Sequence, residues 1–114
     1  MDKVYNMNFT KIYTLLVNKA LRKNRTQEEV NIIIEWLLGY NSNDIEAFVQ
    51  SEITYKDFFE KAPRLNKNRK LIKGSICGIK VEEMNEGLDQ NIRYLDKLID
   101  ELAKGKSLDK ILRK

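Results

Sequence analysis

The residues of this chain best suited to chemistry are the basic side chains between positions 61 and 80. Seven lysines and arginines occur there without one acidic residue, and Gly74, Ser75 and Gly78 lie among them. Backbone amides at glycines can approach a phosphate closely, and a serine hydroxyl can donate a further hydrogen bond. The pattern predicts an anion site, and its candidate contacts are Lys67, Arg69, Lys70, Lys73, Ser75 and Lys80. An enzyme or a binder of a small phosphorylated ligand, held at residues 74–78, is therefore one hypothesis for function.

The sign of the charge reverses directly after this basic segment (residues 61–80). Between residues 82 and 101, seven acidic side chains outnumber Arg93 and Lys97. Acids so close in sequence can neutralise the basic segment within one molecule, and a charged surface steers a partner only while it stays unopposed. We expect an internally balanced charge pattern, with nucleic-acid binding as an alternative that is weak, indifferent to base sequence and sensitive to salt.

Other reactive groups are few. The chain has no histidine and a single cysteine, Cys77, which excludes an internal disulfide, histidine-dependent triads and the common zinc ligand sets. No histidine can activate Cys77, so we expect it to be a small buried apolar residue, and a nucleophilic or redox role is the alternative. Glu82 and Glu83 are adjacent and diverge by about 100° on a helix, which disfavours joint acid and base catalysis. We therefore predict no catalytic residue, no metal site and no cofactor.

A stripe of aliphatic residues in the second half of the chain offers an interface. Its members are Leu88, Ile92, Leu95, Ile99 and Leu102, spaced by four, three, four and three residues. This spacing fits the seam of a two-stranded coiled coil, but two heptads are short for an independent one. We expect the stripe to pack within the molecule, and homodimerisation through it is the alternative.

Residues 26–38 and the helix expected from residue 44 have the lengths of a helix-turn-helix motif. Asp44, Glu46 and Glu52 would then face the phosphates, with no lysine or arginine between residues 44 and 52. The negative charge of these residues opposes DNA binding through this motif.

Five aromatic residues have helical spacing beside aliphatic residues: Trp36, Tyr40, Tyr55, Phe58 and Phe59. We therefore expect them to pack in the core, and a pocket lined by them is the alternative.

Capping residues and helical spacing predict the elements that position these groups. Apolar residues recur every three or four positions from Phe9 to Leu21 after a cap at Asn8, and Thr26 and Glu29 match a capping box. Gly39 supplies a left-handed stop. Helices are predicted over residues 9–23, 27–38, 44–49, 55–62, 88–102 and 108–112, with further caps at Asn41, Ser42 or Asn43, at Thr54 and at Ser107.

The pattern is weakest between residues 63 and 85, where Ile79 and Val81 alternate with a lysine and predict a short extended piece over residues 76–81. Gly74 and Gly78 would bracket a turn there. A chain of 114 residues has room for one hydrophobic core. We predict an all-α, compact single-domain bundle of five or six helices over residues 1–114, with an irregular glycine-containing segment in the second half.

Several blocks of the sequence occur together in one known family. They are FTKIY at residues 9–13, EWLLGY at 35–40, TYKDFF at 54–59, LIKGSICG at 71–78 and IRYLDKLIDELAKGK at 92–106. Over nearly its whole length the chain resembles a small bacterial family catalogued as domain of unknown function family 2200. The resemblance implies no activity, substrate or catalytic residue. Residues 66–68 read Asn-Lys-Asn where the family more often has an Asn-Pro turn.

No stretch reaches the roughly 18 uncharged residues of a membrane span. The first six residues lack the basic end and apolar stretch of a signal peptide, so the expected location is the cytoplasm and no membrane partner is expected. We expect a non-enzymatic binding or protein-interaction module, with self-association as one form of it. The sequence does not identify the partner, which could be a second copy, an anionic ligand or nucleic acid.

Overall fold

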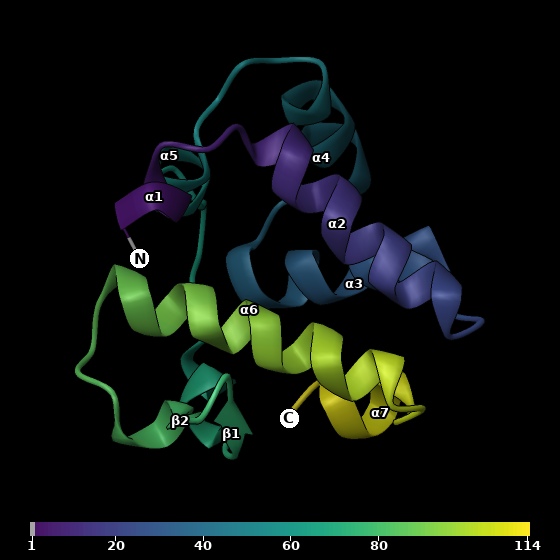
Figure 1. The fold of residues 1–114 in the computed structure, drawn as a ribbon, viewed down its shortest axis with the longest axis vertical. Coiled ribbons are helices and arrows are strands. Elements are labelled where there is room, and N and C mark those ends of the chain that lie inside the picture. The colour runs from purple at the N-terminus through teal and green to yellow at the C-terminus, as the bar shows by residue number, and fades with distance from the viewer. Residues whose placement is uncertain (1) are drawn as a thin grey trace.

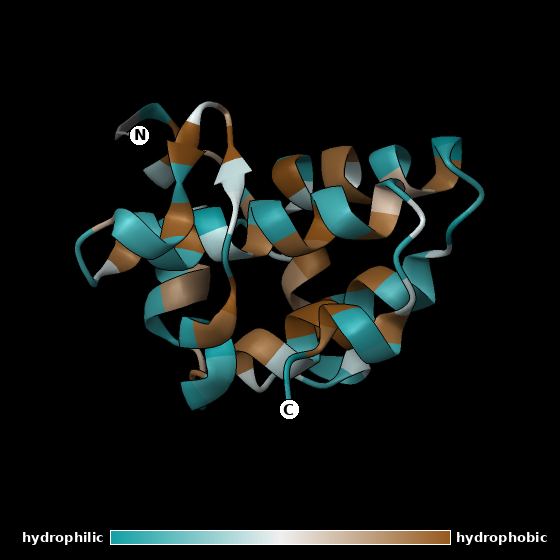
Figure 2. Cartoon of the chain, turned by 90° about the horizontal axis from the view of Figure 1, so that it is seen from below, coloured by the Kyte–Doolittle hydropathy of each residue, from teal (hydrophilic) through white to brown (hydrophobic). Residues whose placement is uncertain are grey.

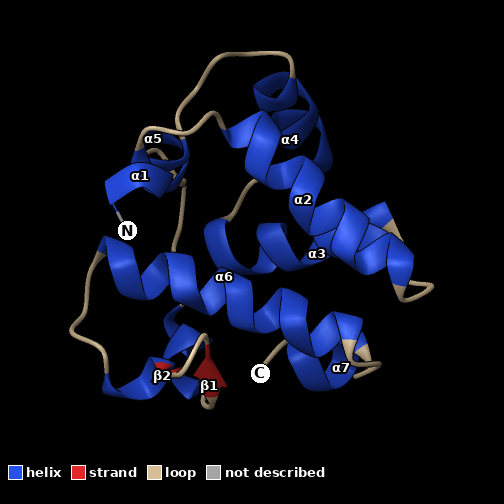
Figure 3. Ribbon diagram, viewed as in Figure 1, coloured by secondary structure: helices blue, strands red, loops and turns tan. Residues whose placement is uncertain are grey.

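The computed structural model describes residues 2–114 and consists mainly of helices (Figure 3). In chain order its elements are α1 (Asp2–Tyr5), α2 (Phe9–Arg22), α3 (Gln27–Leu38), α4 (Ser42–Val49), α5 (Tyr55–Glu60), η1 (Lys67–Leu71), β1 (Ser75–Ile76), β2 (Ile79–Lys80), η2 (Val81–Glu83), α6 (Leu88–Ala103) and α7 (Leu108–Ile111). The all-α prediction is confirmed. Met1 lies outside the described residues. It belongs to the expected domain of residues 1–114 and to the first six residues that were compared with a signal peptide.

Local capping explains where the helices begin and end. The Thr26 hydroxyl accepts from the Glu29 amide while the Glu29 carboxylate accepts from the Thr26 amide, so the predicted capping box is confirmed. Among the three alternatives for the next cap, Asn41 holds the position. Gly39 ends α3 in the left-handed conformation, with φ of 86°. The Asn8 side chain makes no capping bond, because this part of the chain is fixed by backbone pairing with the segment before α5.

The core lies where α2, α3 and α6 contact one another (Figure 1). Figure 2 shows hydrophilic residues alternating with hydrophobic ones along the helices, as expected when one face of each is buried. Phe58 of α5 stacks on Phe9 of α2 with ring centroids 3.9 Å apart, and the Tyr40 hydroxyl donates to the Phe58 carbonyl. Tyr40, Tyr55, Phe58 and Phe59 are buried as predicted, and Trp36 is half-buried.

Residues 63–87 contain the irregular part of the fold. Strands β1 and β2 pair antiparallel around Cys77 and Gly78, which both have positive φ, 53° and 79°. This is the backbone of a two-residue type I′ hairpin. The prediction of one extended piece over residues 76–81 is wrong in its bounds, because the turn at Cys77 and Gly78 interrupts it and Val81 begins η2. Cys77 is exposed on this turn. Buried Ile72 and Val81 fix the segment to the core on either side. The short helices α1 and η1 are elements that the sequence patterns did not predict.

Within residues 2–114, no helix is both long enough and apolar enough to cross a bilayer.

Candidate functional site

The predicted anion contacts lie on η1, on the hairpin and between them, beside acids of the same chain, and all except the half-buried Arg69 are exposed. Lys70 pairs with Glu86 at 3.3 Å, Arg69 pairs with the same carboxylate at 3.6 Å, and Lys80 lies 4.0 Å from Glu83. Lys67, Lys73 and Ser75 are exposed. The acids that follow the basic segment in sequence therefore also lie beside it in space.

The backbone amide best placed for a phosphate already has an acceptor. The Gly74 amide donates to the Glu82 carboxylate at 3.1 Å, and the Ser75 carbonyl accepts from the Lys97 ammonium at 3.4 Å. Hydrogen bonds from the backbone amides of Glu82 and Gly74 hold the pKa of Glu82 below its usual value. A carboxylate of the chain thus takes the Gly74 amide that a phosphate would use, while Ser75 and Gly78 are exposed.

The aliphatic stripe of α6 is not a surface. Ile92, Leu95, Ile99 and Leu102 are at most 2% exposed, and Leu88 is half-buried against the core. The stripe packs within the molecule, as expected, and α2, α3 and α5 cover it. The alternative of an interface through these residues does not fit their position, because they are already covered.

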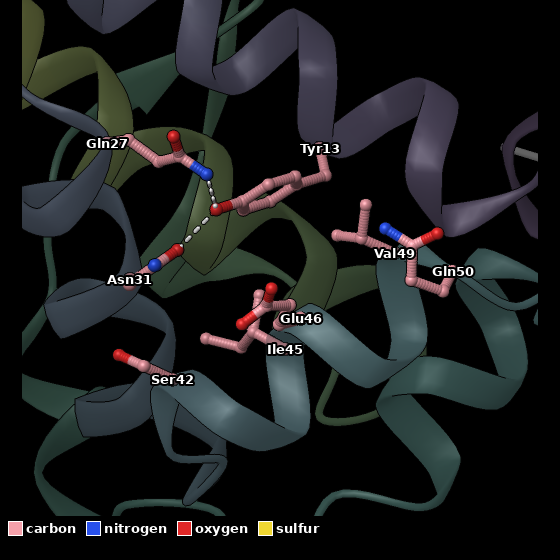
Figure 4. A pocket seen from close by; sticks show the side chains of 8 residues that line it. All are labelled: Tyr13, Gln27, Asn31, Ser42, Ile45, Glu46, Val49 and Gln50. Atoms are coloured by element: carbon pink, nitrogen blue, oxygen red, sulfur yellow. Dashed lines mark hydrogen bonds between the residues drawn. The ribbon is translucent and has the colours of Figure 1, made fainter.

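A pocket that the sequence did not predict lies between α2, α3 and α4 (Figure 4). We call it the α2–α4 pocket. It encloses about 370 Å³, and its lining is Tyr13, Gln27, Asn31, Ser42, Ile45, Glu46, Val49 and Gln50. Its walls come from three consecutive helices, and its lining residues are spread over residues 13–50, so no short motif contains it.

The Tyr13 hydroxyl is the fixed polar point of the α2–α4 pocket. It donates to the Asn31 side-chain oxygen at 2.5 Å and accepts from the Gln27 amide at 3.0 Å (Figure 4). Gln27 and Asn31 are four residues apart on α3, which places them on one face. Gln27 is the first residue after the Thr26 cap, so the capping box fixes the position of the donor. The phenol is therefore oriented before any ligand arrives.

Helix α4 forms the opposite wall of the α2–α4 pocket. Ile45 is buried and Val49 half-buried, while Glu46 and Gln50 are exposed. The Thr10 hydroxyl of α2 donates to the Val49 carbonyl at 2.7 Å and holds the two helices together. Glu46 is the one carboxylate of the lining. The pocket thus combines an apolar base, oriented neutral hydrogen-bonding groups and a negative charge at its edge.

Comparison with known proteins places this structure in a family. A profile described as "Uncharacterized protein conserved in bacteria (DUF2200)" matches residues 3–113. The chain belongs to this family. It is also similar to the chain described as "Crystal structure of uncharacterized protein SP1917", with 43% identity, a TM-score of 0.93, and coverage of 98% of this chain and 92% of that chain. No curated protein matches the chain.

The family description assigns no function. A weak sequence signal for the α2–α4 pocket existed. Tyr13 is the only hydroxyl-bearing member of the buried stripe of α2, and Asn31 interrupts the apolar run from Val30 to Ile34. Polar groups inside apolar stripes need partners when buried. This rule identifies Tyr13 and Asn31 one at a time, but it does not predict that they bind each other.

Proposed function

We propose that this family member is a non-enzymatic binding module of the cytoplasm and that the α2–α4 pocket holds its ligand. The observation that supports the proposal is the Tyr13 hydroxyl, fixed between Gln27 and Asn31 inside a concave site. A group that is oriented before binding loses little entropy when a ligand arrives. Ligand pockets measure about 300–1,000 Å³, so this pocket suits a small ligand or a single side chain.

The charge of the lining selects the class of ligand. Glu46 adds a negative charge, and neither lysine nor arginine is among the lining residues. An ammonium or guanidinium group at Glu46 would gain a charge-assisted hydrogen bond, whereas a phosphate or carboxylate would be repelled. Ile45 and Val49 offer apolar contact to the carbon atoms next to such a group. The proposed ligand is a cation with a short apolar stem, either a free amine or a lysine or arginine side chain of a partner.

Titration by two-dimensional NMR tests this proposal. Butylamine, butylguanidinium and a lysine-containing peptide are compared with butyrate, and the amide signals of α2, α3 and α4 are followed. The cations should shift the signals of residues around Tyr13 and Glu46. Glu46→Gln should weaken cation binding about tenfold because it removes one charge-assisted contact.

Glu52→Gln is the matched control, because Glu52 is an exposed carboxylate just after α4 and does not line the pocket. It should leave the affinity unchanged. Stronger binding of the peptide than of butylamine would identify a protein partner as the source of the cation. Equal shifts by butyrate and butylamine, or equal affinities of the Glu46→Gln and wild-type proteins, would refute the proposal.

A further inference from the structure

A second hollow, of about 560 Å³, lies at the C-terminal end of α6. Four lysines line it, Lys97, Lys104, Lys106 and Lys110, and Ser107 adds a hydroxyl. We call it the lysine hollow. It contains neither the predicted anion contacts of residues 61–80 nor any residue of the α2–α4 pocket.

The fold brings these lysines together from three elements. Lys97 lies on α6, and Lys104, seven residues later, is the C-cap of that helix and lies on the same side of it. Lys110 comes from α7, which lies on the same side of α6 as the hairpin in Figure 1. The turn that carries Lys106 is fixed by Arg25, whose guanidinium donates to the Leu102 and Lys106 carbonyls at 3.0 and 2.9 Å. The hollow is therefore a built feature of the surface.

The acid that lines the lysine hollow is already neutralised. Glu101 has a side chain only 6% exposed, and Arg113 binds both of its carboxylate oxygens, at 2.6 and 2.8 Å. Lys106 lies 3.5 Å from the same carboxylate. The positive charge of Arg113 balances the negative charge of Glu101. The positive charges of the four lysines therefore outnumber the negative charges among the residues that line the hollow.

The ammonium groups of Lys104, Lys106 and Lys110 can reorient toward a ligand, while that of Lys97 donates to the Ser75 carbonyl at 3.4 Å. The Lys104 side chain is 73% exposed and that of Lys106 is 40% exposed. Lys104 pairs with Asp100, but Asp100 has a second cation in Lys19 at 3.3 Å and keeps a partner if Lys104 turns away. Among the described residues, Lys110 has no ion-pair partner. Ser107 is at the N-cap position of α7, yet its side chain makes no capping bond and its hydroxyl remains available.

We propose that the lysine hollow binds a small ligand that carries two or more phosphate groups. Several ammonium groups around one concave surface match the charge of a polyphosphate, and lysine binds phosphate as a mobile point charge. The buried Glu101–Arg113 pair distinguishes this site from the basic segment, where exposed carboxylates compete with any incoming anion. The ligand is either an inorganic polyphosphate or the phosphate chain of a nucleotide.

Calorimetric titration with inorganic triphosphate, at about 50 mM and about 200 mM salt, tests the site. The double variant Lys106→Gln/Lys110→Gln should weaken binding at least about tenfold, since two ammonium contacts are lost. The matched control Lys67→Gln/Lys70→Gln removes the same charge from the basic segment and should change the affinity less than about twofold. Circular dichroism checks that each variant is folded. The single variant Lys110→Gln measures the loss of triphosphate affinity without breaking an ion pair of the protein.

A nucleoside triphosphate titrated in parallel identifies the source of the phosphates. Tighter binding than inorganic triphosphate, lost in the same double variant, would support a nucleotide ligand, and equal binding would support a polyphosphate. No binding of triphosphate at either salt concentration would overturn the proposal. Equal losses in the two double variants would overturn it as well, because they would show attraction to net charge without a site.

Discussion

The basic segment and the lysine hollow are both rich in lysine but differ in where their acids lie. Beside the basic segment, Glu83 and Glu86 are exposed and pair with its cations, and the exposed Glu82 accepts from the Gly74 amide. In the lysine hollow, Glu101 is buried beneath the lysines and bound by Arg113. Lysine content alone therefore does not identify an anion site. Exposed carboxylates compete with an incoming anion for the lysines, whereas a buried and paired carboxylate leaves the lysines able to attract it.

The two regions also differ in how much their ion pairs contribute to stability. Exposed pairs such as Lys70–Glu86 contribute between about 0 and 1 kcal/mol, because solvent screens them and the side chains lose freedom. Glu101 has little access to water and depends on its partners. Loss of one partner from a buried pair leaves an uncompensated charge. The comparison predicts a large effect at one site and a small one at the other.

The largest expected effect is that of Arg113→Ala. It leaves the buried Glu101 carboxylate with Lys106 alone and should lower the free energy of unfolding by about 3 kcal/mol. Lys70→Ala, which breaks an exposed pair, should change it by less than about 1 kcal/mol. Urea denaturation followed by circular dichroism measures both values. Equal losses in the two variants would show that the burial of Glu101 is not what distinguishes the regions.

A smaller effect is expected at Asp96, between the two regions on α6. Burial raises the pKa of Asp96 from 3.8 to about 6, although Arg93, 3.6 Å away, and Lys19 act to lower it. The folded protein thus binds this proton more tightly than the unfolded chain does. The contribution of Asp96 to stability is present below about pH 4 and is lost as the pH rises through 6.

Asp96→Asn keeps the side chain neutral and removes this loss. Relative to wild type, it should gain about 2 kcal/mol of stability between about pH 4 and about pH 8. Urea denaturation at the two pH values gives the difference directly. A gain that does not change with pH would show that the effect comes from the shape of the side chain and not from its ionisation.

The smallest effect is expected for nucleic acid at the basic segment. We expect weak binding of RNA and duplex DNA at low salt, lost near physiological ionic strength, because the acids of residues 82–86 oppose it. Removal of the charges of Lys67, Arg69 and Lys70 should weaken it about equally for all base sequences. Fluorescence anisotropy at two salt concentrations measures this. Tight binding that persists in high salt would show that the exposed acids do not neutralise the segment.

The sequence predicted the local elements well because local interactions fix them. The capping box at Thr26 and the stop at Gly39 depend on residues within a few positions of each other. The short helices α1 and η1 were missed, since single turns have too few residues to show a period. For the stripe of α6, the spacing placed the residues on one face but did not tell whether this face meets the same chain or another.

The amino-acid sequence by itself determined that this chain is helical, where most of its helices begin and end, and to which family it belongs. Only the tertiary structure decided which charges face each other and which side chains share a pocket. The Tyr13–Asn31 bond and the Glu101–Arg113 pair join different elements, and the lysine hollow collects residues from α6, α7 and the turn between them. Such contacts follow from how helices pack, and a pattern read along one helix carries no information about what lies opposite it.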